Sequence, residues 1–534
     1  MAADLAIVGA SIRTMDPDRP LATAIAIKEG IITAVGDDAT IRTECDGTTE
    51  VIDGPRLKMV PGLTDSHFHP FWGTTATRGV DLTRAKTLDD LRALLSAERA
   101  RIGPDAWVIG WGLTFEMFQP TGIRGDLFAD AVGGSLAYLG FFDGHTSVAS
   151  PAALAYCDIT GRERFEDFST VVVDTQGVPT GELQEMGAQS LVLNVIPKPS
   201  EAEKYRWYVE NMKIWNSLGL TGLHVMLGKR ETLDLARQLE GNGDLSLRMI
   251  IPLWQEPDVT FEEMESLLSL RDESGKRWRG GVAKFFMDGV IESGTSWLLE
   301  PDIKGQNNAP FWPDPAKYTA AVDLFAKAGF QIATHAVGDR AIRHALDAYQ
   351  ASGAAPGIRH RIEHIELLDD DDLPRFAELG VTASMQPLHM NAYEADGSDE
   401  WSTRVGPERR KQAFRTRELK DSGAVLALGS DWMVASYDPR YGMAWANLRR
   451  IPGEKERGCI QPEQALTMLE VLEGYTTEAA RAVSEERISG QIKEGFRADL
   501  SAFAEDLVDC DPDQLPSLPC LLTVVDGEIV YRAE

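Results

Sequence analysis

Eight short apolar runs separated by helical patterns constrain the fold of this 534-residue chain more than any other feature of its sequence. We interpret the runs as strands at residues 59–69, 219–224, 247–252, 281–287, 330–335, 359–364, 381–385 and 425–430. Helical patterns lie between them, for example at residues 317–328, 340–350 and 373–379. Eight strands that alternate with helices are typical of a (β/α)8 TIM barrel, so we predict an α/β protein built on that barrel.

Polar residues stand where several of these apolar runs end. His224, His335 and His364 each close a predicted strand, and Asp431 follows the last strand. In a (β/α)8 barrel the catalytic residues lie at the carboxyl ends of the strands. The positions of these side chains therefore predict an active site at that end of the barrel.

The first predicted strand ends in two histidines one residue apart. It follows a turn at Pro61 and Gly62 and finishes with His67 and His69. Residues at i and i+2 of a strand point to the same side, so both imidazoles aim at one point, as two ligands of a metal ion do. A solvated loop that carries two unrelated histidines fits this short motif equally well.

A lysine stands within a very apolar strand. Lys284 lies in the segment Val282–Gly289, where its charge is costly unless its pKa falls or it finds a partner. A lowered pKa gives a neutral amine that can add carbon dioxide, and the two carbamate oxygens can then bridge two metal ions. The alternative, which residue type alone favours, is a lysine that reaches the surface or pairs with a carboxylate such as Asp288.

The two ends of the chain share a β-rich texture. Short apolar runs with turns fill residues 1–58, and similar runs fill residues 485–534, where Asp526-Gly527 is a strong hairpin signal. We therefore predict one small β domain assembled from both ends, around a hydrolase barrel at residues 59–484. Two separate β appendages are the alternative.

A long excursion interrupts the barrel after its first strand, at residues of about 70–205, and it is dense in aromatic side chains. Long insertions at the catalytic face often act as lids or pocket walls. We expect part of this insertion to cover the site. The alternative is a satellite core far from the chemistry.

Composition narrows the class of protein. The net charge is −30, from 83 acidic and 53 basic side chains, which argues against nucleic acid or an anionic membrane as partner. The five cysteines form no C-x-x-C pair, and we see neither a signal peptide nor a run of the ~20 apolar residues that span a bilayer. We expect a cytoplasmic protein that acts on a small molecule.

Six short motifs, and a seventh near the carboxyl end, occur in an order that is highly specific. They are Pro61–His69, Gly177–Glu185, Lys284–Gly289, Thr334–Arg340, Arg361–His364, Gly429–Asp431 and Gly490–Leu500. In these motifs the whole chain resembles the amidohydrolase superfamily, within the branch of YtcJ-like metal-dependent hydrolases that includes N-substituted formamide deformylase. The chain departs from the family pattern at His224-Val225, where relatives often have His-Asp, which places direct transfer of a relative's substrate in question.

The resemblance implies a fold and a metal centre. It implies a barrel with a β-sandwich domain built from both termini, and one or two divalent ions, zinc or a related metal. His67 and His69 would bind the first ion, and His335 and His364 the second. An N6-carboxylated Lys284 would bridge them, while Asp431 would bind metal and act as general base and then general acid. A homodimer would agree with the resemblance.

Further side chains are candidates for binding substrate. His224 ends the second strand and is expected to contact substrate; Trp72 and Trp297 follow ligand strands and line either an apolar pocket or the packed barrel rim. His145 either polarises a carbonyl from the insertion or braces a turn. His344 and His389 are expected to be structural or exposed, the second because it falls in a predicted loop.

The sequence thus predicts an enzyme, a metal-dependent amidohydrolase that cleaves a non-peptide C–N bond. An amide or N-substituted formamide with an apolar or aromatic group is the expected substrate. Metal-assisted ester hydrolysis or decarboxylation on the same barrel is one alternative, because a fold does not fix a function. A non-catalytic binding or regulatory protein is another, although the complete set of six ligands argues against it.

Overall fold

The computed structural model describes residues 2–103, 106–141, 146–165 and 169–533. The chain forms two compact units, one made of residues 1–70 and 209–534 and the other of residues 71–208. The larger unit holds the barrel and a β-sandwich. The smaller unit corresponds to the long excursion after the first barrel strand.

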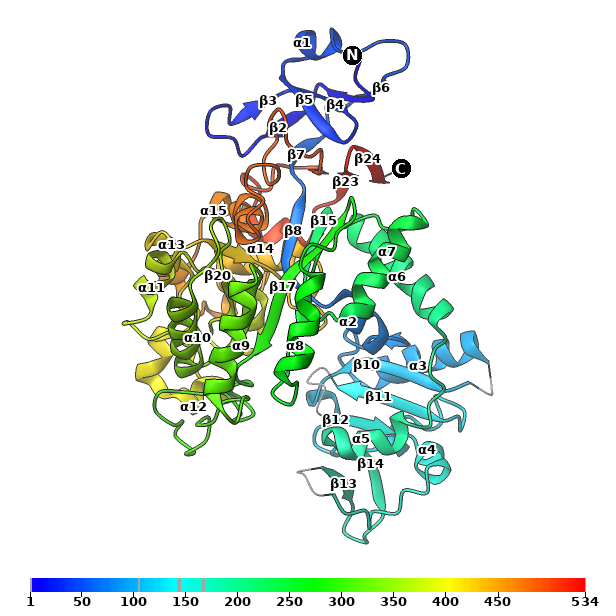
Figure 1. The fold of residues 1–534 in the computed structure, drawn as a ribbon. Coiled ribbons are helices and arrows are strands. Elements are labelled where there is room, and N and C mark those ends of the chain that lie inside the picture. The colour runs from blue at the N-terminus through cyan, green and yellow to red at the C-terminus, as the bar shows by residue number, and fades with distance from the viewer. Residues whose placement is uncertain (1, 104–105, 142–145, 166–168, 534) are drawn as a thin grey trace. The chain divides into compact units, whose positions relative to one another are not determined.

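Eight parallel strands pair in chain order and build the barrel (Figure 1). They are β8 (Leu63–Phe68), β15 (Leu220–Val225), β16 (Arg248–Trp254), β17 (Trp278–Phe286), β18 (Gln331–Ala336), β19 (Arg361–His364), β20 (Thr382–Met385) and β21 (Leu426–Leu428). Helices lie between consecutive strands, among them α7 (Arg230–Gly241), α8 (Phe261–Leu267), α9 (Pro315–Lys327), α10 (Asp339–Ser352), α11 (Leu373–Leu379) and α13 (Thr416–Asp421). The predicted TIM barrel is confirmed.

The first and last barrel strands meet through a side chain rather than a regular ladder. Asp65 on β8 is fully buried, and its Oδ1 accepts hydrogen bonds from the amides of His67 and Ser430, each at 3.0 Å. Beyond it, the Asp431 amide donates to the His67 carbonyl at 2.8 Å, and the His69 amide donates to the Trp432 carbonyl at 3.0 Å. This seam fixes the end of β8 against the segment that follows β21.

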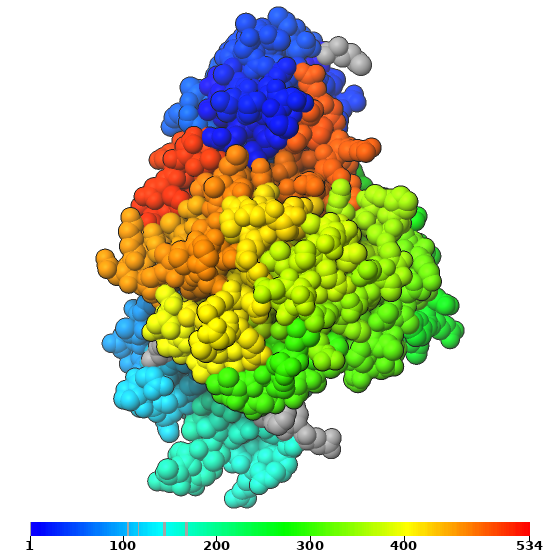
Figure 2. Space-filling model, turned by 90° about the vertical axis from the view of Figure 1, so that its left-hand side faces the viewer, coloured from blue at the N-terminus to red at the C-terminus, as the bar shows by residue number. Residues whose placement is uncertain are grey.

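Both ends of the chain contribute to the β-sandwich. One sheet has the order β24-β23-β22-β7-β2-β3, in which β7 (Lys58–Pro61) pairs antiparallel with β22 (Leu500–Phe503). The second sheet, β5-β4-β1-β6, comes from the N-terminal segment alone. Figures 1 and 2 show the red and orange C-terminal segment beside the blue N-terminal one. The alternative of two separate β appendages is therefore wrong.

The remaining sandwich strands all lie in the two β-rich ends predicted from the sequence. They are β1 (Leu5–Val8), β2 (Ser11–Arg13), β3 (Leu21–Ala22), β4 (Ala24–Lys28), β5 (Ile31–Gly36), β6 (Glu50–Asp53), β23 (Cys520–Val525) and β24 (Glu528–Arg532). The predicted hairpin joins β23 and β24, with Asp526 and Gly527 at φ of 57° and 76°. Residues with positive φ at both turn positions are the signature of a type I′ hairpin.

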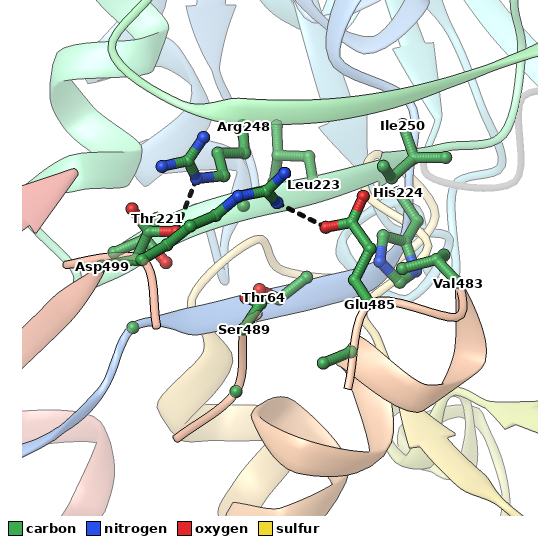
Figure 3. A pocket seen from close by; sticks show the side chains of 15 residues that line it. Thr64, Thr221, Leu223, His224, Arg248, Ile250, Val483, Glu485, Ser489 and Asp499 are labelled. Carbon is green, nitrogen blue, oxygen red and sulfur yellow. Dashed lines mark hydrogen bonds and ion pairs between the residues drawn. The ribbon is translucent and has the colours of Figure 1, made fainter. Parts of the chain in front are cut away.

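Ion pairs join the sandwich to the amino-terminal end of the barrel. Arg248 at the start of β16 pairs with Asp499 at 2.5 Å and Asp526 at 3.0 Å. Glu485 accepts from Arg279 at 2.7 Å and from Arg497 at 2.6 Å. Four of these side chains line the cavity of Figure 3: Arg248, Glu485, Arg497 and Asp499. The cavity lies at the strand starts and not at the carboxyl ends where the active site is predicted.

The smaller unit has its own sheet, in the order β13-β14-β12-β11-β10-β9. Its main elements are α3 (Leu88–Ile102), β9 (Val80–Asp81), β10 (Val108–Leu113), β11 (Ala137–Phe141), β12 (Thr146–Ala149), α4 (Pro151–Tyr156), β13 (Thr170–Val173), β14 (Pro179–Gln184) and α5 (Glu185–Leu193). Aromatic residues Phe118, Phe128 and Phe141 pack in its own core. That this unit covers the site stays a prediction.

In the described ranges of the chain, no helix is long and apolar enough to cross a membrane.

We predict that Asp65→Ala destabilises the metal-free protein. The change leaves the buried amides of His67 and Ser430 without an acceptor, at about 1–3 kcal/mol each. For domains of this size we expect the midpoint of thermal unfolding to fall by roughly 5–15 °C. Asp65→Asn keeps the accepting oxygen and is the matched control. Equal losses in both variants, measured by calorimetry, would contradict the role of Oδ1.

Candidate metal centre

The barrel brings four of the predicted histidines together at the carboxyl ends of β8, β18 and β19. The ring centroids of His67 and His69 are 5.4 Å apart, and those of His67 and His364 are 4.6 Å apart. His335 continues the cluster at 4.3 Å from His364. Histidines from three strands thus form one continuous group.

Asp431 lies at the centre of this group. Its Oδ1 is 2.9 Å from Nε2 of His69 and 3.4 Å from Nε2 of His67, while its Oδ2 is 3.9 Å from Nδ1 of His364. His67, His69 and Asp431 form one set of potential metal ligands whose atoms all lie within 4.8 Å of one another. His364 and Asp431 form a second set with His389.

Left-handed backbone positions make this convergence possible. In β19 the side chains of Arg361 and Glu363 lie in the barrel interior, so regular alternation would turn His364 away from them. His364 instead has a φ of 78°, and its ring joins the cluster. Asp431 likewise has a φ of 58° just after β21. Non-glycine residues seldom adopt this conformation, and such strain tends to gather at functional sites.

Lys284 is buried on β17 without a bonded partner. Its side chain is 1 % exposed, and its Nζ makes no hydrogen bond to any residue that the structure describes. Asp288 is engaged elsewhere, because it accepts from Ser296 and from the Trp297 amide. Burial lowers the pKa of Lys284 to about 8, although the charges of Glu363 and Asp431 act to raise it. The alternative that Lys284 reaches the surface or pairs with Asp288 is therefore wrong.

The donor set suits a divalent metal ion. Burial lowers the pKa of His67 to about 4, and it holds the pKa values of His335 and His364 well below their usual range. Neutral imidazoles and carboxylates are the usual ligands of zinc and related ions. Besides Lys284 Nζ, the buried Nδ1 of His364 makes no hydrogen bond within the described residues. Such buried polar atoms are what a bound cation would satisfy.

His389 was expected to be structural or exposed, and the structure excludes the exposed alternative. It lies in a short 3-10 helix, Pro387–Ala392, with only 10 % of its side chain exposed. Its Nε2 is 3.4 Å from Oδ2 of Asp431, and its Nδ1 is 3.5 Å from Oε1 of Glu366. The signal was present in the sequence, because the segment directly follows the seventh barrel strand, β20.

Three of the residues predicted to bind substrate are described by the structure, and they lie in different segments of the chain. His224 is buried on β15, and its Nδ1 accepts from Arg361 at 2.9 Å. Trp297 packs against His344, with ring centroids 5.5 Å apart. Trp72 is half exposed on α2 (Pro70–Ala76), in the smaller unit. His145 lies outside the described residues.

Comparison with known proteins identifies the family. Residues 50–531 match the model described as the amidohydrolase family. The chain belongs to the amidohydrolase family. It is 26 % identical to the YtcJ protein of Bacillus subtilis over 98 % of this chain and 98 % of that protein. It is also 26 % identical to N-substituted formamide deformylase of Arthrobacter pascens, over 99 % of this chain and 98 % of that protein.

The fold also matches a solved structure. A metal-dependent hydrolase from Pyrococcus horikoshii, 23 % identical, superimposes with a TM-score of 0.74 over 95 % of this chain and 99 % of that one. The predicted superfamily branch and the predicted enzyme class are confirmed. The protein is therefore a hydrolase of the amidohydrolase type.

We predict that Lys284→Met stabilises the metal-free protein at pH 7. It removes a buried amine that has no hydrogen-bond partner and keeps much of the apolar volume. We expect the midpoint of thermal unfolding to rise by about 3 °C or more. Arg361→Met, which removes a buried cation with several partners, should instead lower it.

The pH dependence of this gain provides a second measurement. The pKa of Lys284 falls from 10.5 to about 8 on folding, so the unfolded chain binds more protons between these values. The wild type therefore gains stability as the pH rises through this window, and the advantage of Lys284→Met should shrink from pH 7 to pH 9.5. A variant that melts below the wild type at pH 7 would contradict the assignment.

Proposed function

We propose that this protein hydrolyses the C–N bond of small N-substituted formamides or related amides. The observation that carries this proposal is the cluster of histidines around Asp431, in which burial lowers the pKa of His67 to about 4, together with the unpartnered amine of Lys284. The similarity to N-substituted formamide deformylase supports the formamide as substrate class. The substrate would be a free small molecule, and the five free cysteines support a reducing, cytosolic setting.

We assign the metal ligands as predicted from the sequence. His67, His69, His335, His364 and Asp431 would hold one or two ions, with zinc the metal that best suits this set of nitrogen and oxygen donors. When bound, such an ion polarises a carbonyl and lowers the pKa of water from ~15.7 toward ~7. His389 is an additional candidate ligand beside Asp431 and His364.

Lys284 would serve as a carboxylated ligand. With a pKa of about 8, about a tenth of the Lys284 amine is uncharged at pH 7, far more than for an ordinary lysine. The Nζ lone pair adds to the carbon of carbon dioxide and Nζ loses one proton, which leaves a carbamate anion with two oxygen donors. The buried position of the amine limits competition from water.

Asp431 would carry the proton during the reaction. Burial disfavours its charge, but His67 and its other histidine neighbours hold its pKa well below the usual range, so it is ionised and able to accept a proton. Its Oδ would take the proton of the attacking water and then deliver it to the departing nitrogen, as a general base and then a general acid. The left-handed turn at Asp431 holds the carboxylate at the centre of the cluster.

Aromatic rings beside the cluster support an apolar substituent on the substrate. The ring of Phe286 lies 4.0 Å from that of His335, and Phe311 packs edge-on against Phe286 at 5.0 Å. Phe311 is 44 % exposed. A half-exposed aromatic edge next to the ligands would accommodate an alkyl or aryl group by hydrophobic contact.

We predict chelator-sensitive hydrolysis of N-substituted formamides. A panel of N-benzylformamide, N-butylformamide, the matching acetamides and the matching formate esters would be assayed by release of the amine or alcohol. We expect the N-benzyl and N-butyl formamides to be cleaved, the activity to disappear on exhaustive chelation and to return with zinc. Preferred cleavage of the esters, or activity that survives chelation, would overturn the proposal.

We predict that Asp431→Asn lowers turnover of the formamide by about 100-fold or more, the usual contribution of a positioned acid–base group. The amide cannot accept the proton of the nucleophile, while its oxygen can still contact the neighbouring cluster. Asp526→Asn is the control, since it lies in the hairpin far from the ligands at a φ of 57° that asparagine tolerates. Near-normal kcat in folded Asp431→Asn would remove this role.

A further inference from the structure

One buried arginine ties four barrel strands together next to the candidate ligands. The side chain of Arg361 is 1 % exposed. Its donors contact Glu363 Oε1 at 2.5 Å, Glu363 Oε2 at 3.0 Å, His224 Nδ1 at 2.9 Å, the Ser66 carbonyl at 2.6 Å and Ser384 Oγ at 2.7 Å. These partners lie on β8, β15, β19 and β20. The planar guanidinium therefore fixes the Glu363 carboxylate at both oxygens.

Glu363 transmits this fixed position to a candidate metal ligand. Its side chain is fully buried, and its Oε2 lies 2.8 Å from Nδ1 of His67. Arginine only donates, so both carboxylate oxygens act as acceptors and His67 must donate from Nδ1. In a neutral imidazole this leaves the lone pair on Nε2, the atom that lies 3.4 Å from Asp431.

His224 also forms a hydrogen bond with this arginine. Because Arg361 cannot accept a hydrogen bond, Nδ1 of His224 is the acceptor. The ring of His224 therefore helps to hold the guanidinium in position. Burial and the charge of Arg361 hold the pKa of His224 well below its usual value, so the ring stays neutral. His224 is thus placed to hold Arg361, whereas its predicted contact was with substrate.

We propose that Glu363 is a positioning residue of the metal centre, which selects the His67 tautomer that presents Nε2 to the metal and is itself held by Arg361. The inference rests on the proposed function only in requiring that His67 bind a metal ion. A carboxylate behind a histidine ligand orients the ring and raises its basicity, and its loss typically weakens metal binding about 10- to 100-fold.

A purely structural ion pair is the competing explanation, and the chain offers a matched example. Glu485, drawn in Figure 3, is also a largely buried carboxylate, and it pairs with Arg279 and Arg497. It lies at the opposite end of the barrel strands. Replacement of either glutamate by glutamine removes one charge and turns one acceptor into a donor. Only the change at residue 363 brings that donor toward His67 Nδ1.

The test compares zinc affinity in Glu363→Gln and Glu485→Gln. Purified metal-free proteins would be titrated with zinc against a chromophoric chelator, and their thermal midpoints measured without metal. We expect both variants to melt lower, but only Glu363→Gln to bind zinc about 10- to 100-fold more weakly. Zinc affinity within about threefold of wild type in a folded Glu363→Gln, or an equal loss in both variants, would show that the ion pair is structural only.

A measurement on the wild type guards against a variant that does not fold. In metal-free protein labelled with 15N-histidine, long-range proton–nitrogen spectra distinguish the two neutral tautomers. We expect the His67 signal, assigned by its absence in His67→Asn, to show the proton on Nδ1. A proton on Nε2 would overturn the proposal.

Failure of the proposed function is separable from failure of this one. Wild-type protein that binds zinc tightly but cleaves no formamide would reject the proposed reaction and leave the comparison of affinities intact. Wild-type protein that binds neither zinc nor cobalt would reject both, because Glu363 would then have no metal centre to position.

Discussion

The seam between β8 and the segment after β21 is the constraint on which the site depends. One buried carboxylate, Asp65, replaces the ladder that would otherwise close the barrel. Two main-chain hydrogen bonds beyond it hold His67 and His69 against Asp431 and Trp432. The candidate ligands from the first and last strands therefore meet because the barrel closes. A shift of one residue in the register between these strands would move the ligands apart.

Arg361 and Lys284 are both buried basic side chains of the barrel, but their hydrogen bonding differs. Each nitrogen of the Arg361 guanidinium donates to at least one acceptor, so its burial ties strands together. Lys284 has none among the described residues, so its burial leaves the metal-free fold with an uncompensated polar group. Arg361, whose hydrogen bonds are made within the protein, thus contributes to stability. Lys284, whose amine has no hydrogen-bond partner among the described residues, favours binding of a ligand.

Much of this fold could be predicted from local pattern. The eight strands, the Asp526-Gly527 hairpin and the polar residues at strand ends follow from periodicity and turn chemistry, which are properties of neighbouring residues. His389 was missed because it follows a short strand within an irregular segment, where the pattern indicates only a loop. Arg361 contacts His224, and Glu363 contacts His67, because of which strands face each other across the barrel. The sequence of one strand alone does not predict this arrangement.

A single residue, Gly62, separates sandwich strand β7 from barrel strand β8. A Cβ atom at Gly62 would lie 2.2 Å from Oγ1 of Thr221, so the backbone there packs too closely for any larger residue. One neighbour of β7 in its sheet, β2, precedes it in the chain, but the other, β22, begins only at Leu500. During synthesis on a ribosome, the strand that carries His67 therefore emerges early, while the sheet that anchors its start is completed only when nearly the whole chain has been made. The metal centre is consequently among the last parts of the molecule to gain its full support.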